Sequence, residues 1–144
     1  MYYIGIDIAK NRHQVCFLDE DGNVLDGNSF NIRNNASGFA RLEQMLSRYH
    51  LSPDNTLVGM EATGHYWLVL YSWFLEKGFQ VKVIHPLVTD GYRHMQVRKA
   101  KTDRIDAEVV AKVLCLGMFF PTECVIAVLL SEVLRLPPEP PLLF

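Results

Sequence analysis

Apolar residues gather along this chain in short runs whose spacing changes from strand-like to helix-like. Runs at residues 2–8, 14–18 and 24–32 are rich in β-branched and aromatic side chains, and an Asp-Gly pair separates the second run from the third. Asp-Gly favours the positive φ angles of tight hairpins. The first part of the chain therefore predicts an antiparallel meander of three strands, of which Gly27 weakens the third.

Helical and strand periodicities then alternate. Helical spacing of apolar residues is found over 39–49 and 65–77, and Gly78 is expected to end the second helix. Strands are expected at 56–61 and 79–83, where apolar residues form a run or alternate with polar ones. The second helix is the stronger of the two because its apolar residues form one stripe. This stripe consists of Trp67, Leu70, Tyr71, Phe74 and Leu75.

Two further helical segments complete the ordered pattern. A short helix is expected over 90–97, and Thr102 is expected to cap a helix in which Ile105, Val109 and Val113 face the core. A strand meander followed by alternating helices and strands predicts an α/β fold, with a mixed five-stranded sheet flanked by helices.

The character of the chain changes after Cys115. A proline-rich segment at 136–141 cannot form a helix or a central strand. We therefore expect one domain over residues 1–116 and a divergent, poorly ordered tail over 117–144. The composition of this tail is also that of a stretch read outside its natural frame.

Composition and cysteine usage indicate a globular protein. The hydrophobic share of 49% and the charged share of 21% are typical of folded domains rather than disordered chains. The apolar stretch 113–130 is interrupted by Pro121 and Glu123, which argues against a membrane helix. Three cysteines without ligand spacing, and a start without a signal sequence, predict reduced thiols and a cytoplasmic location.

Four acidic residues occupy positions that suggest a metal site. Asp7 lies within an apolar strand, Glu61 ends another, and Asp103 and Asp106 share one face at the start of a helix. A carboxylate in a core strand is costly unless it is bound, and a divalent cation with oxygen ligands would offset this cost. Taken singly, each acid also has a simpler explanation, such as a helix-dipole contact for Asp103. Together they predict a cation site for phosphodiester chemistry.

Basic residues cluster immediately before and among the last two acids. Lysine and arginine beside a metal-dependent site suit a phosphate backbone, and the alternative is a solvated surface. The predicted nucleic-acid-binding residues are Arg93, Arg98, Lys99, Lys101 and Arg104.

Three motifs resemble a known protein family. They are Gly-Ile-Asp-Ile-Ala-Lys at 5–10, Glu-Ala-Thr-Gly-His-Tyr at 61–66 and Lys-Thr-Asp-Arg-Ile-Asp-Ala at 101–107. Over residues 2–116 the chain resembles the N-terminal domain of the DEDD transposases of insertion sequences, which are recombinases guided by a bridge RNA. The resemblance implies an RNase H-like fold of the RuvC type. It also implies that the four acids are catalytic and bind Mg²⁺, with Mn²⁺ as an alternative.

The same resemblance implies partners and a further domain. It implies a DNA substrate, a structured guide RNA and assembly into dimers or tetramers, with no membrane partner. The family also has a C-terminal domain with a nucleophilic serine, but nothing after Cys115 resembles it, and Ser131 has no matching context. The chain is therefore expected to be an incomplete recombinase domain. The alternative is an inactive fragment that binds nucleic acid or full-length subunits.

A third class of protein also begins with a Gly-Ile-Asp strand. Sugar kinases and actin-like ATPases use this aspartate to contact metal-bound phosphate, but they need a second lobe and glycine-rich phosphate loops. The sequence has neither, and this class leaves the motif at 101–107 unexplained.

Overall fold

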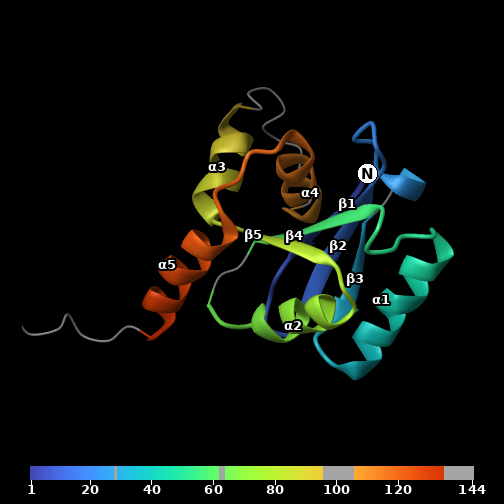
Figure 1. Cartoon of the computed structure of the whole chain (residues 1–144), viewed down its shortest axis with the longest axis horizontal. Coiled ribbons are helices and arrows are strands. Elements are labelled where there is room, and N and C mark those ends of the chain that lie inside the picture. The colour runs from blue at the N-terminus through green and yellow to red at the C-terminus, as the bar shows by residue number, and fades with distance from the viewer. Residues whose placement is uncertain (28, 62–63, 96–105, 135–144) are drawn as a thin grey trace, which may run out of the picture.

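A five-stranded mixed sheet forms the centre of the computed structural model, which describes residues 1–27, 29–61, 64–95 and 106–134 (Figure 1). The strand order is β3-β2-β1-β4-β5, with antiparallel pairing from β3 to β1 and parallel pairing from β1 to β5. The mixed sheet predicted from the sequence is confirmed. The strands are β1 (Tyr2–Asp7), β2 (Arg12–Leu18), β3 (Phe30–Arg33), β4 (Thr56–Glu61) and β5 (Gln80–Ile84).

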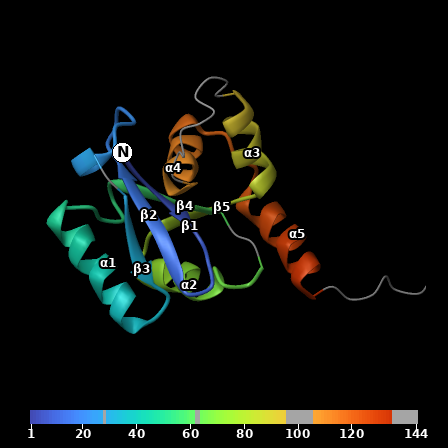
Figure 2. The same cartoon turned by 180° about the vertical axis from the view of Figure 1, so that it is seen from behind.

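Helices cover both faces of the sheet. One face carries α1 and α2, the other carries α3 and α4, and α5 lies beside β5 (Figures 1 and 2). The N-cap of α1 is Asn35, one of the two residues expected there, whose side chain accepts a hydrogen bond from the Gly38 amide. The helices are α1 (Ala36–Arg48), α2 (Leu68–Glu76), α3 (Pro86–Met95), α4 (Asp106–Leu116) and α5 (Thr122–Leu134).

Strand alternation divides the core between the two faces. Ile4 and Ile6 of β1 are fully buried in the cluster that α1 and α2 cover, so their neighbours along the strand point toward α4. A Cβ atom on Gly5 would lie only 2.3 Å from the Ala111 amide nitrogen. Glycine at this position therefore allows the backbone of α4 to lie directly on β1.

The third strand is shorter than predicted. The interval expected to be strand at 24–32 instead contains the 3₁₀ helix η1 (Leu25–Gly27), and β3 begins at Phe30. Gly27 has a φ of +69°, which breaks the extended conformation that a strand requires. Before η1, Val24 keeps a strand-like contact, an isolated bridge to Leu18.

The second helix begins later and buries less than predicted. It was expected over 65–77, but α2 begins at Leu68. Trp67, Leu70 and Phe74 of the predicted stripe are buried, whereas Leu75 is 47% exposed. The stripe on this short helix is narrower than a full amphipathic face. Gly78 follows the helix with a φ of +90°, as predicted for a stop.

The later helices differ from the sequence expectations at their ends. The short helix expected over 90–97 begins at Pro86, because proline is well suited to a first helical position. Val109 and Val113 of α4 are buried as predicted, while Thr102 and Ile105 lie outside the described residues.

An unpredicted helix, α5, forms within the segment expected to be a tail. The Thr122 hydroxyl oxygen accepts a hydrogen bond from the Val83 amide at 3.3 Å, so the start of α5 covers the free edge of β5. Among the described helices, none has the length and apolar character needed to cross a bilayer.

Candidate active site

Two acidic residues meet where the parallel strands β1 and β4 end. Asp7 and Glu61 are the last residues of their strands and are directly paired in register. Since Ile6 and Met60 are buried toward α1 and α2, both carboxylates point to the opposite face, beneath α4. Neighbouring strands lie about 4.8 Å apart. The sheet itself therefore brings these two predicted site residues together.

Asp106 joins this pair from the first turn of α4, the helix that packs on β1. Asp106 lies close enough to Asp7 to affect the pKa of the Asp7 carboxyl group. Burial raises the pKa of Asp7 to about 6, and the charges of Asp106 and Glu61 add to this effect against an opposing influence of Arg93. Three of the four predicted acids thus interact electrostatically, and Asp103 lies outside the described residues.

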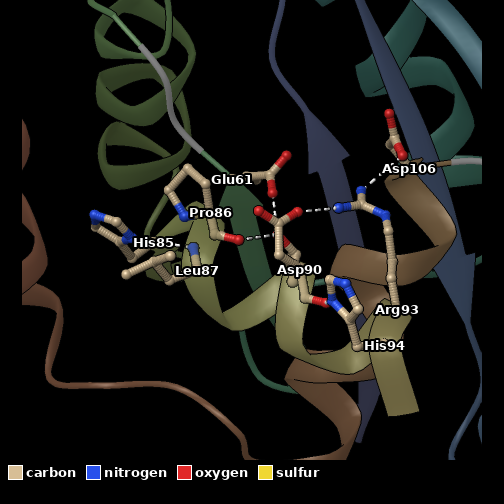
Figure 3. Close-up of polar contacts among 9 residues, drawn as sticks. Glu61, His85, Pro86, Leu87, Asp90, Arg93, His94 and Asp106 are labelled. Atoms are coloured by element: carbon tan, nitrogen blue, oxygen red, sulfur yellow. Dashed lines mark hydrogen bonds and ion pairs between the residues drawn. The ribbon is translucent and has the colours of Figure 1, made fainter. Parts of the chain in front are cut away.

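Glu61 is held by a residue of α3 (Figure 3). The Thr89 hydroxyl donates a hydrogen bond to the Glu61 carboxylate and lies 2.9 Å from the Pro86 carbonyl oxygen. Thr89 is fully buried. Burial raises the pKa of Glu61, while the hydrogen bond from Thr89 and the charge of Arg93 oppose the rise.

Arg93 connects the two helices above the site (Figure 3). Its guanidinium lies 2.9 Å from a carboxylate oxygen of Asp90 and 2.7 Å from one of Asp106. The sequence suggested a basic residue available to phosphate, but in the structure Arg93 is paired with two acids. The remaining predicted basic residues, Arg98, Lys99, Lys101 and Arg104, lie outside the described residues.

The chemistry of the donor set suits a hard divalent cation. Asp7, Glu61 and Asp106 offer only carboxylate oxygens, which Mg²⁺ and Mn²⁺ prefer. Burial and the neighbouring acidic charges together raise the pKa of Asp7, and a bound cation would offset both costs. Within the described parts of the chain, no three acidic, histidine or cysteine side chains surround one point closely enough to hold an ion. The four-carboxylate site therefore stays a prediction.

The sequence analysis missed Asp90 and Thr89 at this site. The spacing of Asp90 and Arg93, three apart on a helix, is a signal for their ion pair. Thr89 gave no comparable signal, because its partner Glu61 lies 28 residues away in the chain.

Comparison with known protein families shows to which family this chain belongs. Residues 4–124 match the profile of a transposase family, the DEDD transposases of the IS110 type. The chain belongs to this transposase family. The resemblance noted in the sequence is thereby confirmed, and the match includes the segments that carry Asp7, Glu61 and Asp106.

Two relatives of this transposase chain are known as pilin gene-inverting proteins, from Moraxella lacunata and Moraxella bovis. Each is 34% identical over 110 residues, which is 76% of this chain and 33% of the relative. The chain therefore spans about a third of the length of these relatives.

Solved structures show the same fold. RuvC from T. thermophilus, in complex with a Holliday junction substrate, superposes with a TM-score of 0.56 at 14% identity, over 84% of this chain and 99% of the other. A further T. thermophilus RuvC structure gives a TM-score of 0.57 at 15% identity with the same coverage. The expected RuvC-type, RNase H-like fold is confirmed.

Proposed function

We propose that this chain is the metal-dependent catalytic domain of a DEDD transposase, acting on DNA. The observation that supports the proposal most directly is the in-register pair Asp7 and Glu61, with Asp106 beside it and the pKa of Asp7 raised to about 6. Three carboxylates near one another at the end of a buried sheet suit cation binding better than a structural role.

In this proposal each residue near the site has a distinct part. Asp7, Glu61, Asp103 and Asp106 would hold Mg²⁺, with Mn²⁺ as an alternative. The bound ion would supply Lewis-acid activation of a phosphodiester. Thr89 keeps the Glu61 carboxylate in a fixed orientation through its hydrogen bond. The residues predicted from the sequence to contact phosphate are Arg93, Arg98, Lys99, Lys101 and Arg104, of which Arg93 also pairs with Asp90 and Asp106.

The partners in this proposal follow from the family. DNA is the proposed substrate, and a structured guide RNA and a homo-oligomer are the proposed assembly. The gene-inverting relatives and the RuvC structure with a Holliday junction support a DNA substrate. Because the chain spans a third of its relatives, a second candidate function is binding of nucleic acid or full-length subunits without catalysis.

Metal-dependent stabilisation tests the site directly. Saturating Mg²⁺ at a hundred times Kd stabilises a protein that binds it by about 2.7 kcal/mol, which corresponds to several degrees in melting temperature. We expect this shift for the wild type and its loss in Asp7→Asn, because the variant removes one ligand charge. Thermal melts with chelator and with added Mg²⁺ measure it.

The matched control for this experiment is Asp54→Asn, which removes the same charge from an exposed position just before β4, at the end of the strand opposite Glu61. This variant should retain the full response to Mg²⁺. An identical shift in Asp7→Asn and the wild type would contradict the proposed site.

A further inference from the structure

Two arginines lie directly opposite each other at the outer side of the sheet. Arg12 of β2 and Arg33 of β3 are cross-strand partners, and both are exposed. Like charges directly opposite on adjacent strands destabilise a sheet. An anion between the two side chains would offset this repulsion.

Two further basic residues surround this pair. A hollow of about 440 Å³ is lined by Arg12, Arg33 and Arg41, and an adjoining hollow of about 400 Å³ is lined by Lys10, Arg12 and Arg33. The residues that line the two hollows include no acidic side chain. In the described part of the chain, none of the four basic side chains forms an ion pair.

The fold holds these residues in place. A Cβ atom on Gly38 would lie 1.8 Å from the Arg33 carbonyl oxygen, so the first turn of α1 packs tightly against the end of β3. The Arg41 guanidinium donates a 2.6 Å hydrogen bond to the Asn31 carbonyl oxygen and lies 5.5 Å from the centre of the Phe30 ring. Arg41 is thereby fixed at the edge strand rather than free in solvent.

The paired arginines of β2 and β3 lie at the same end of the sheet as the carboxylates. Asp7, at the end of β1, pairs with Gln14, two residues from Arg12 at the start of β2. β3 is two strands away from β1, which corresponds to about 10 Å. For a duplex whose axis runs across the strands, with a rise of about 3.4 Å per base pair, this separation is roughly three base pairs.

We propose that Lys10, Arg12, Arg33 and Arg41 form a binding site for the phosphodiester backbone of the DNA strand that reaches the carboxylates. This inference rests on the proposed function and adds a contact surface on the side of the active site away from α3. The DNA duplex crosses the end of the sheet, with phosphates on the arginines of β2 and β3, and the arginine of β3 lies about three base pairs from the reacting position.

Charged residues on an edge strand also have a simpler use, which is to prevent pairing with another sheet. The two roles predict different results. Protection of the edge predicts increased aggregation when the arginines are replaced, with DNA binding unchanged. A phosphate site predicts weaker DNA binding by a protein that remains monodisperse.

The experiment compares Arg12→Gln/Arg33→Gln with the wild type in binding to labelled duplex DNA, measured by fluorescence anisotropy in chelator. Between about 50 and 200 mM salt, the slope of log affinity against log salt should fall by about two, because each phosphate contact contributes about 0.9. Affinity at low salt should weaken several-fold. Arg48→Gln, which removes a charge at the other end of α1, is the matched control and should bind as the wild type.

Several outcomes would overturn the proposal. These are no measurable duplex binding by the wild type, an unchanged salt slope in the double variant, and a loss confined to an RNA hairpin probe. A second variant, Lys10→Gln/Arg41→Gln, leaves Arg12 and Arg33 intact. It should show the same loss of DNA affinity, and it provides the test if Arg12→Gln/Arg33→Gln folds poorly. The Mg²⁺-induced melting shift should be unchanged in both variants, and its absence from the wild type would refute the proposed metal site rather than this DNA contact.

Discussion

His13 is a buried residue that contributes to the pH response of the fold. It is fully buried on β2, its Nδ1 atom accepts a 3.2 Å hydrogen bond from the Ala9 amide, and its Nε2 atom has no partner in the described structure. Burial lowers the pKa of His13, and the nearby Asn34 side chain only partly opposes this effect. The folded protein therefore keeps this imidazole neutral.

A pH dependence of stability follows from this depressed pKa. The unfolded chain binds a proton at His13 near pH 6.5 and the folded protein binds it only at lower pH. The contribution of His13 to stability is therefore full above about pH 6.5 and decreases as the pH falls below it. His13→Asn keeps an acceptor for the Ala9 amide but does not titrate. We expect denaturant unfolding at pH 7.5 and pH 5 to show a smaller stability loss in this variant than in the wild type.

His65→Asn is the control for this prediction, because it removes an exposed histidine. It should lose as much stability as the wild type between the two pH values. Equal losses in His13→Asn and the wild type would assign the acid sensitivity to other groups.

At the residue scale, the sequence predicts a site residue where its own neighbours make it anomalous. Asp7 stood out because apolar residues flank it, and the structure places it beside two of the other predicted acids. Thr89 and the bridging role of Arg93 depend on contacts between β4, α3 and α4, which no local pattern encodes. Such tertiary contacts become visible only in the folded molecule.

At the element scale, α4 determines where Asp106 lies relative to the sheet. Its backbone approaches β1 so closely that a methyl group on Gly5 would lie 2.3 Å from the Ala111 nitrogen and 2.4 Å from the Ala107 carbonyl oxygen. Both contacts are with backbone atoms, which cannot move aside as a flexible side chain can. Any side chain at this position must therefore displace the helix that carries Asp106.

We expect Gly5→Ala to reduce both stability and the response to metal. Overpacking of this kind costs about 1–3 kcal/mol, and a shifted α4 would also misplace Asp106. The free energy of unfolding and the Mg²⁺-induced melting shift measure the two effects. A variant that retained both wild-type values would show that α4 adapts without disturbing the site.

Gly91→Ala is the matched control within α3. A Cβ atom there would have no neighbour within 4 Å, so the same substitution should be neutral or stabilise by up to about 1 kcal/mol. The contrast between the two variants separates close packing from the general effect of removing a glycine.

The elements themselves were predictable where their periodicity was strong. α1, β4 and β5 appear close to their expected ranges, because caps, alternation and a stop glycine agree at these places. The third strand was overextended because Gly27 adopts a positive φ that favours η1. α5 was missed because its stability depends on contacts with β5, including the hydrogen bond from Val83 to Thr122, rather than on a regular apolar stripe.

At the scale of the whole molecule, the carboxylates gather at one end of the sheet, between the strand ends and the helices α3 and α4. This arrangement provides a rigid anionic site, since the strands and α4 are fixed by the core. The resemblance assigns the attacking group to a serine in another domain, and the sequence predicts that residues 117–144 do not form that domain. Cation-binding groups alone cannot carry out a covalent exchange that needs this nucleophile.

We therefore expect the 144-residue chain alone to bind Mg²⁺ and nucleic acid but to form no recombinant product. The assay incubates purified protein with donor and target plasmids, Mg²⁺ and guide RNA, and detects recombinant junctions by amplification across them. A full-length family member serves as the positive control, and Asp7→Asn in that protein as the negative control. Junctions formed by the 144-residue chain alone would contradict the expectation, and would place a nucleophile within the sequence printed above.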